Sequence, residues 1–573
     1  MAQGGQVMKN VYKWMIASFC AVVMVACSED FLTRDPYGST ITQGQFEKLA
    51  NQLEGSMRGI YSMMYNVTDH DEFGKRSIDM YTDIMSSDMA LTNYTYGWFY
   101  TDEAGQGRTG RTAYIWYFYY GMLHNVNAVL FSAQGGNAAS ADNVIKRIDA
   151  NGLPNKSVTK SGETTYYTIS GTDTLASFTE TEAQIANLYA QALTMRGYIY
   201  SNLVMLYCDQ SRDIADFSKE LAFPMYTEDN MNEAQPLATM SEVYAQLESD
   251  LTTAIAYFNA FSTIERKSKL EVNKAVACGI LAYSYLNKGK GNKGHGDAQA
   301  QIYTHARDYA LEAISSGTSS VLPRAQLFET GFNDVNTNCW IWGQDVTTET
   351  AGGLASFFGQ VDIHSYSYAW AGDTKAIDAN LYDSIAKANP WDARVLWFND
   401  GSANATYKLC PDGKFYSAKN RYSTKDDDID REWLSDNVFM RVEAMYLIAA
   451  EASYRLNNDG EAITYLTTIT DQRIAEGKED AYNDFTTNYL GGPRLNILKA
   501  IEYNWRVEMW GEGYGLQTFR RLAAEVLDGT ERKRGSNHCS NAGSTIKGGS
   551  EYTFQMPSSE GSYNPSINTT TLP

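Results

Sequence analysis

The residues of this chain best suited to chemistry are aromatic and polar side chains that recur at every second position. The stretch DMALTNYTYGWFY, residues 88–100, carries four such aromatic residues, Tyr94, Tyr96, Trp98 and Tyr100, together with the polar residues Asp88 and Asn93. In an extended chain the four aromatic rings would lie on one face. Flat rings stack on the apolar faces of sugars, while amide and carboxylate groups bind hydroxyls at the rim. The pattern predicts a sugar-binding platform, although a buried strand or core loop would look the same.

A second stretch, DIHSYSYAW, residues 362–370, repeats the alternation with His364, Tyr366, Tyr368 and Trp370. We predict that Trp98 and Trp370 are the stacking platforms and that Asp88 and Asn93 bind hydroxyls. The remaining predicted ligand-binding residues are Tyr94, Tyr96, Tyr366 and Tyr368. By contrast, Trp340 and Trp342 in CWIWGQ are predicted to belong to a core strand.

Motifs for catalysis, cofactors or metals are missing from the sequence. The histidines form no HExxH pair, no GxSxG occurs, and KGKGNKGHG, residues 288–296, lacks the closing Gly-Lys-Ser/Thr of a phosphate loop. The acidic run DDDID, residues 426–430, lacks the glycine and final glutamate of a calcium loop. We therefore predict a non-catalytic protein with no cofactor and no metal. A glycoside hydrolase remains the alternative, because it needs only two carboxylates roughly 5–10 Å apart.

The N-terminus has the form of an export signal. Lys9 and Lys13 precede an apolar run of about a dozen residues, which is shorter than the roughly 20 that span a bilayer. The run ends in Val25-Ala26-Cys27, which resembles a bacterial lipobox, with Met24 at the usual leucine position. We predict a signal peptide over residues 1–26 and lipidation at Cys27. The acidic residues that follow Cys27 resemble a signal for the cell surface.

The charge of the chain narrows the choice of partners. The formal charge is −21, and removing residues 1–26, which hold two lysines and no acids, makes it −23. Nucleic acid and anionic membrane surfaces both require basic patches. The negative net charge therefore argues against binding to nucleic acid or to an anionic membrane surface, and it is compatible with a neutral ligand.

Helical periodicity dominates the elements that must position these residues. Residues 239–258 begin with a capping box between Thr239 and Glu242 and continue as one apolar stripe. Residues 182–207 are apolar around most of the circumference, which predicts a central helix. Cys208 and Cys278 fall in helical patterns and are predicted to be small core residues.

Two segments predict similar helical pairs. ILAYSYLNKG, residues 280–289, parallels AAEASYRLNNDG, residues 449–460, and an amphipathic segment follows each. This resembles a tetratricopeptide repeat, although unrelated helical hairpins are an alternative. Residues 318–436 are instead broken by Gly, Asn and Asp, as in a loop-rich insertion.

Five stretches in order resemble SusD/RagB-type nutrient-binding lipoproteins of the outer membrane. They are CSEDFLTRDPYG, YIWYFYYGMLHNVNAVL at 114–130, RVEAMYLIAAEASYRLNNDGEAI at 441–463, WRVEMWGEGYGLQTFRRL at 505–522, and MPSSEGSYNP with Pro557, Glu560, Asn564 and Pro565. The fourth stretch carries Glu508, Glu512, Gly513 and Arg521 of the family pattern. It departs from that pattern at Asn504, Trp505, Gly515 and Thr518, which puts local packing in doubt.

The resemblance implies a mostly α fold in which tetratricopeptide-like pairs form a scaffold, with minor strands and an irregular ligand-binding face. It implies binding of an oligosaccharide or polysaccharide, or of a peptide in some branches, and delivery to a SusC-like TonB-dependent outer-membrane transporter. It also implies a lipid anchor in the outer membrane, facing the exterior. The predicted body, residues 27–573, comprises a scaffold at about 45–130, 180–316 and 437–527, a binding insertion at about 318–436, and an irregular tail at about 528–573.

Overall fold

The computed structural model describes residues 43–567, apart from gaps at 94, 101–109, 137–142, 154, 162–163, 169–176, 210–213, 215, 292–296, 329–331, 365, 414, 416–433, 528–530, 541 and 548–551. Cys27, Tyr94 and the acidic run 426–430 lie outside the described residues. Within those residues, no helix combines enough length and apolarity to cross a bilayer.

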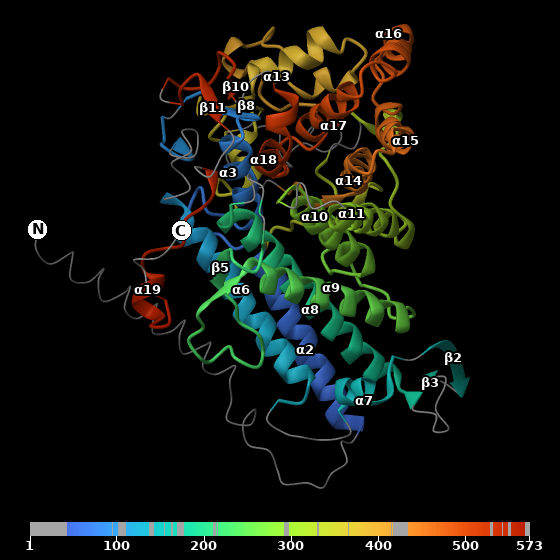
Figure 1. Ribbon diagram of the computed structural model, residues 1–573. Coiled ribbons are helices and arrows are strands. Elements are labelled where there is room, and N and C mark those ends of the chain that lie inside the picture. The colour runs from blue at the N-terminus through green and yellow to red at the C-terminus, as the bar shows by residue number, and fades with distance from the viewer. Residues whose placement is uncertain are drawn as a thin grey trace, which may run out of the picture.

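Long helices form one half of the molecule, in the lower part of Figure 1. Its central helix α8 (Glu180–Tyr207) is buried along nearly its whole length, as predicted, and begins at a capping box between Thr179 and Glu182. A second capping box, between Thr239 and Glu242, is also confirmed. The helices that pack against α8 include α2 (Gln43–Met63), α6 (Thr112–Ala133), α7 (Val144–Asn151) and α9 (Met240–Ala260).

Paired helices continue the body along one side of Figure 1. The pairs are α10 (Lys274–Gly291) with α11 (Asp297–Ser316) and α14 (Val442–Arg455) with α15 (Asp459–Thr470). Helix α11 packs on α14, so the pairs stack as in a tetratricopeptide array. Helix α10 runs through Gly289, and α14 ends at Arg455, shortly before Asn457, whose φ of 60° suits a left-handed cap.

A buried ion network joins the second pair to α17 (Leu495–Glu508). The Glu508 carboxylate accepts hydrogen bonds from Arg394 at 3.1 Å, Arg441 at 3.0 Å and Arg473 at 2.8 Å, and all four side chains are fully buried. Burial opposes ionisation of Glu508, but the three guanidinium groups outweigh it and hold the pKa of this glutamate well below its usual value. The network fixes α17 against α14.

Local contacts accommodate three of the four departures from the family pattern. Asn504 accepts a hydrogen bond from Arg394 at 2.9 Å, and Trp505 donates one to Glu451 at 2.9 Å. Gly515, the first residue of α18 (Gly515–Val526), leaves no room for a side chain, since a Cβ would lie 2.4 Å from the Ser86 hydroxyl oxygen. Thr518 is fully buried, and its hydroxyl has no hydrogen-bond partner in the described part of the chain.

The strands are short. The antiparallel pairs are β1 (Met89–Leu91) with β8 (Lys375–Ile377), β5 (Leu221–Pro224) with β6 (Leu237–Thr239), β7 (Trp340–Gln344) with β9 (Asn437–Arg441), and β10 (Glu531–Lys533) with β11 (Thr545–Lys547). One three-stranded sheet has the order β2 (Asn155–Ser161), β3 (Thr164–Thr168), β4 (Ser177–Phe178). Trp340 and Trp342 are buried in β7, and Cys208 and Cys278 are buried as well, so these core predictions are confirmed.

Short elements complete the described part of the chain. The α-helices are α3 (Lys75–Met85), α12 (Phe357–Val361), α13 (Ala379–Asp383), α16 (Glu479–Asp484) and α19 (Glu560–Tyr563). The 3₁₀ turns are η2 (Arg324–Gln326), η4 (Ala393–Trp397) and η5 (Ala405–Tyr407), and the π turns are η3 (Ser384–Ala388) and η6 (Phe485–Tyr489). The predicted mostly α fold is confirmed.

Candidate ligand-binding site

The strand pair β1–β8 brings the two aromatic stretches together. Leu91, the last residue of β1, lies opposite Lys375, the first residue of β8, in antiparallel register. The pairing continues one step further, where the backbone N–H of Thr92 donates to the carbonyl of Thr374 at 3.1 Å. The segment that follows β1 therefore lies beside the segment that precedes β8.

An aromatic cluster forms where these segments meet. Its members are His70, Tyr96, Trp98 and Tyr368. The Tyr368 ring contacts Tyr96 at a centroid distance of 5.0 Å and Trp98 at 6.1 Å, both edge-on. His70 stacks on Trp98 at 5.3 Å with an interplanar angle of 24°, and its Nδ1 lies 2.7 Å from the Tyr368 hydroxyl. The cluster joins both predicted stretches and a third segment.

An exposed pair of rings, Tyr366 and Trp370, stands next to the aromatic cluster in the same loop. The two rings lie 5.2 Å apart at 43°, and each residue is 46% exposed. The Trp370 backbone is held on both sides, because its N–H donates to Ser367 Oγ at 3.0 Å and its carbonyl accepts from the Tyr407 hydroxyl at 3.0 Å. The pair therefore offers fixed aromatic surface to solvent.

The predicted alternation of side chains along an extended strand is not seen in the described residues of either stretch. Gly97 and Phe99 have φ of 79° and 63°, so residues 95–99 turn, and Phe99 is fully buried between Phe73 and Tyr81. In the second stretch Tyr368 is only 8% exposed, while Tyr366 and Trp370, two positions away on either side, face solvent. Turns, rather than an extended chain, aim the rings of these two stretches.

Asp88 is the predicted site residue that the structure places elsewhere. It is 1% exposed, and its carboxylate pairs with Arg506 at 2.7 Å and Arg532 at 3.3 Å. Its carbonyl accepts a hydrogen bond from Trp510 Nε1 at 2.9 Å. The prediction that Asp88 contacts ligand hydroxyls is wrong, because its carboxylate is enclosed in the core.

Polar groups surround the aromatic residues. Asn93 is exposed, its side-chain oxygen accepts from the Thr95 hydroxyl at 2.8 Å, and its amide N–H groups make no hydrogen bond to a described residue. His364 Nε2 lies 3.1 Å from Asp412 Oδ1. Burial opposes ionisation of Asp412, but the bond and charge of His364 prevail and lower the pKa of this aspartate. A charged carboxylate is thus held against His364, which precedes Tyr366 by two positions in the chain.

Sequence reasoning missed His70, Tyr407 and Asp412. His70 lies in a short loop after α2, and its carbonyl accepts from Gln360 at 2.7 Å. Its contacts to Trp98 and Tyr368 bridge distant parts of the chain, so no local pattern marks it. Tyr407 and Asp412 lie within the predicted loop-rich segment, which was the only signal for them.

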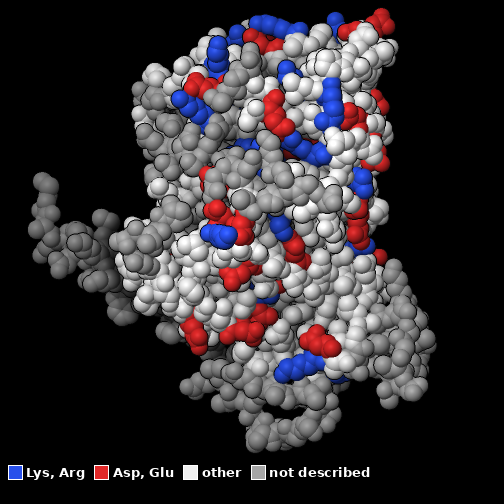
Figure 2. All heavy atoms as spheres, in the orientation of Figure 1, with Lys and Arg blue, Asp and Glu red and all other residues white. Residues whose placement is uncertain are grey.

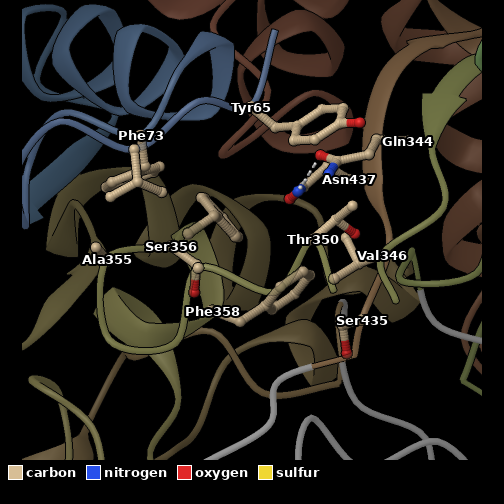
Figure 3. A pocket seen from close by; sticks show the side chains of 13 residues that line it. Tyr65, Phe73, Gln344, Val346, Thr350, Ala355, Ser356, Phe358, Ser435 and Asn437 are labelled. Carbon is tan, nitrogen blue, oxygen red and sulfur yellow. Dashed lines mark hydrogen bonds between the residues drawn. The ribbon is translucent and has the colours of Figure 1, made fainter. Parts of the chain in front are cut away.

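A separate small cavity lies between the segment that follows α2, the adjoining ends of β7 and β9, and α12 with the loop before it (Figure 3). It holds about 20 Å³, which suits one water. Asn437 donates to Gln344 at 2.8 Å beneath the Tyr65 ring, while the buried Asn437 Oδ1 has no partner in the described part of the chain. The space is too small for a sugar, and a water fits the open acceptor.

The described residues of the site are mainly aromatic and uncharged polar side chains with a few acids. Among the described residues, no three His, Cys, Asp or Glu side chains group as a metal site. In Figure 2, lysine and arginine side chains are scattered among acidic ones on the visible coloured surface. Two aromatic surfaces with polar groups beside them are therefore the main chemical feature of the site.

Comparisons with known proteins agree with this fold. The chain resembles, in structure, a SusD-like carbohydrate-binding protein from Bacteroides vulgatus, with 22% identity, a TM-score of 0.63, and coverage of 91% of this chain and 97% of that one. SusD superfamily proteins from Bacteroides thetaiotaomicron and Bacteroides fragilis each share 17% identity, at TM-scores of 0.63 and 0.60, with 91% and 99% coverage. No curated protein matches the chain.

Two family models match the sequence itself. One, described as starch-binding and associating with the outer membrane, matches residues 163–286. The model of the SusD family matches residues 280–570, which is just over half of the chain. The second match includes the buried network around Glu508 and the motif that contains Glu560. The protein belongs to the SusD family.

Proposed function

We propose that the protein binds an oligosaccharide or polysaccharide at the aromatic site, leaves it intact, and passes it to a SusC-like TonB-dependent transporter. One observation carries the proposal: the rings of Tyr96, Trp98 and Tyr368 converge from distant segments, and the exposed Tyr366 and Trp370 flank Tyr368 along the chain. Rigid aromatic area beside hydrogen-bonding groups suits a sugar, which has both apolar faces and hydroxyls.

The division of the site into two ring surfaces favours a chain of sugars over a single one. The aromatic cluster and the exposed pair are separate contacts, so neighbouring sugar units can use one each. Binding two linked units costs less entropy than binding two free ones, because the second contact is intramolecular. We therefore expect affinity to rise with chain length.

The charges around the site favour a neutral glycan. Lys375 is fully buried in a 2.8 Å ion pair with Asp373, and Arg111 is paired with Asp71. Neither offers a free cation to a sulfate or uronate group. Asp412 beside His364 and the exposed Asp69 would instead repel anions.

The cellular setting of the proposal comes from the sequence and the family. Lipidation at Cys27 would tether the body to the outer membrane, since acyl chains contribute about 0.8 kcal/mol per buried methylene. The matched model described as starch-binding and associating with the outer membrane supports this location. The transporter partner follows from the family resemblance, and co-purification of a barrel protein from outer membranes with the lipidated chain would test it.

Calorimetry tests the binding step. The chain beginning after Cys27 is titrated with a panel of neutral polysaccharides and their oligosaccharides, and the mixtures are then separated by chromatography. Binding with the glycan recovered at full length is the expected result. Shortened products would establish a glycoside hydrolase instead, and binding of peptides but not glycans would move the protein to the peptide-binding alternative.

A further inference from the structure

A second cavity lies away from the aromatic site, between α6, the segment that follows β5, and α19. Figure 1 shows α19 at the edge of the helical body, beside α6, and contacts from Trp116 and Tyr117 of α6 hold it there. The cavity measures about 360 Å³. That volume lies within the range of small-molecule sites, about 300–1,000 Å³.

Hydrogen bonds fix the walls of this cavity before any ligand arrives. Tyr120 donates to the carbonyl of Pro224 at 2.6 Å, and Asn127 donates to the carbonyl of Tyr226 at 2.8 Å. Asn564, which follows α19, donates to the carbonyl of Gln235 at 2.8 Å and lies 3.3 Å from the Tyr226 hydroxyl. Because hydrogen bonds hold the walls to α6 and to each other, ordering them on ligand binding would cost little free energy.

The lining combines aromatic rings with polar groups that can still form hydrogen bonds to a ligand. Tyr563 is 81% exposed at the mouth, and the Tyr226 ring stands edge-on to Tyr120 at 6.1 Å. Glu560 uses one carboxylate oxygen to accept from Trp116 at 3.1 Å. Its other oxygen, and the side chains of His124 and Glu233, make no hydrogen bond to any described residue.

The charge of the lining excludes anions. Glu560 and Glu233 both line the cavity, and no lysine or arginine is among its lining residues. Burial and the charge of Glu560 raise the pKa of Tyr226, so its hydroxyl keeps its proton and remains a donor. The cavity thus offers carboxylate acceptors, a phenol donor and aromatic surface, which match the hydroxyls and apolar faces of a sugar ring.

The cavity is distinct from the aromatic site. Its lining residues on α6, Tyr120, Leu123, His124 and Asn127, share one face of the helix. At about 100° per residue this face is turned roughly 130° from Tyr114. Tyr114 contacts Tyr81, which packs on Phe99 next to Trp98. The two sites therefore lie on different sides of α6.

We propose that this cavity is a second carbohydrate site, which takes one or two neutral pyranose units by stacking on Tyr563 and hydrogen bonding to Glu233, Glu560 and the Tyr226 hydroxyl. The proposal does not depend on the function of the aromatic site. It gives the protein a separate contact for a sugar unit or a branch.

Ligand-observed NMR with methyl α-glucoside, methyl β-galactoside and methyl α-mannoside tests the proposal. The variants are Tyr563→Ala, Glu233→Gln, and the double variant Trp98→Ala/Trp370→Ala. We expect saturation transfer to at least one glycoside in the double variant. The dissociation constant of that glycoside should rise about tenfold when Tyr563→Ala is combined with the double variant. Glu233→Gln keeps the shape of the lining and should also weaken binding.

Several results would overturn the second site. Loss of all glycoside signal in Trp98→Ala/Trp370→Ala, or unchanged binding in both Tyr563→Ala and Glu233→Gln, would do so. Arginine methyl ester is the competing probe, and its binding in place of the sugars would identify a cation site. Glycoside binding that is lost only in Tyr563→Ala and Glu233→Gln would support the second site while counting against the function proposed for the aromatic site. Tyr489→Ala, at another exposed tyrosine, is the control.

Discussion

The rings of Tyr96 and Tyr368 meet edge-on at a centroid distance of 5.0 Å, although they come from opposite halves of the chain. The contact exists because β1 and β8 pair directly behind it. The buried Lys375–Asp373 ion pair and the Lys375 ammonium near the Phe99 ring, at 5.8 Å, tie the same junction to the core. The site therefore rests on the packed body rather than on a loose loop.

Trp370→Ala should weaken glycan binding about tenfold and leave stability unchanged. Trp370 is half exposed, and its ring contact is with Tyr366, so truncation removes stacking area without opening a cavity in the core. Calorimetry and the thermal unfolding midpoint measure the two effects. Tyr489→Ala, which removes another exposed ring, is the matched control. A shifted midpoint with unaltered affinity would contradict the assigned role.

Tyr368→Phe should lower affinity severalfold at a stability cost of about 1 kcal/mol. The substitution keeps the ring but deletes the hydroxyl that lies 2.7 Å from His70 Nδ1. Without that bond His70 is freer to leave its stacked position on Trp98, and the platform loses its fixed orientation. Titration calorimetry and urea unfolding report the two quantities. Equal affinities for Tyr368→Phe and the parent would show that the bond does not orient the platform.

The sequence predicts local features well and long-range ones poorly. Helical periodicity and the capping boxes depend on neighbours within one or two turns, so α8 and α9 are recognisable from residue types alone. The prediction for Asp88 is wrong because its partners, Arg506 and Arg532, lie near the other end of the chain. His70 was missed for the same reason, since its contact with Trp98 exists only after folding.

Asp88→Ala should destabilise the protein by about 3–5 kcal/mol. It leaves the buried Arg506 and Arg532 without this carboxylate, although both retain Glu502. Affinity for glycan, measured below the unfolding transition, should be retained because Asp88 does not reach the site. Asn93→Ala is the paired variant: its side chain is exposed, so we expect weaker binding and normal stability. Weaker binding with normal stability in Asp88→Ala, together with unchanged binding and lower stability in Asn93→Ala, would identify Asp88 as a ligand contact.

Asp83 should make stability fall as the pH rises through the weakly acidic range. Burial raises the pKa of its carboxyl to about 7, from 3.8, and the nearby Asp88 and Asp79 charges add to this although the Gly515 N–H opposes it. Between these values the folded state holds a proton that the unfolded state releases. The contribution is therefore complete below about pH 4 and lost by about pH 7, at up to about 1.4 kcal/mol per pH unit.

Asp83→Asn isolates this effect, because the amide cannot ionise. Its oxygen can still accept from the Gly515 N–H, which lies 2.9 Å from Asp83 in the parent, while the contact to Gly513 at 3.2 Å is lost. We expect the variant to be less stable than the parent at pH 5. By pH 8 this difference in the free energy of unfolding should disappear or change sign. Urea unfolding midpoints across this range measure the gap. A gap that stays constant with pH would mean that Asp83 is ionised throughout, with its charge balanced by neighbouring cations.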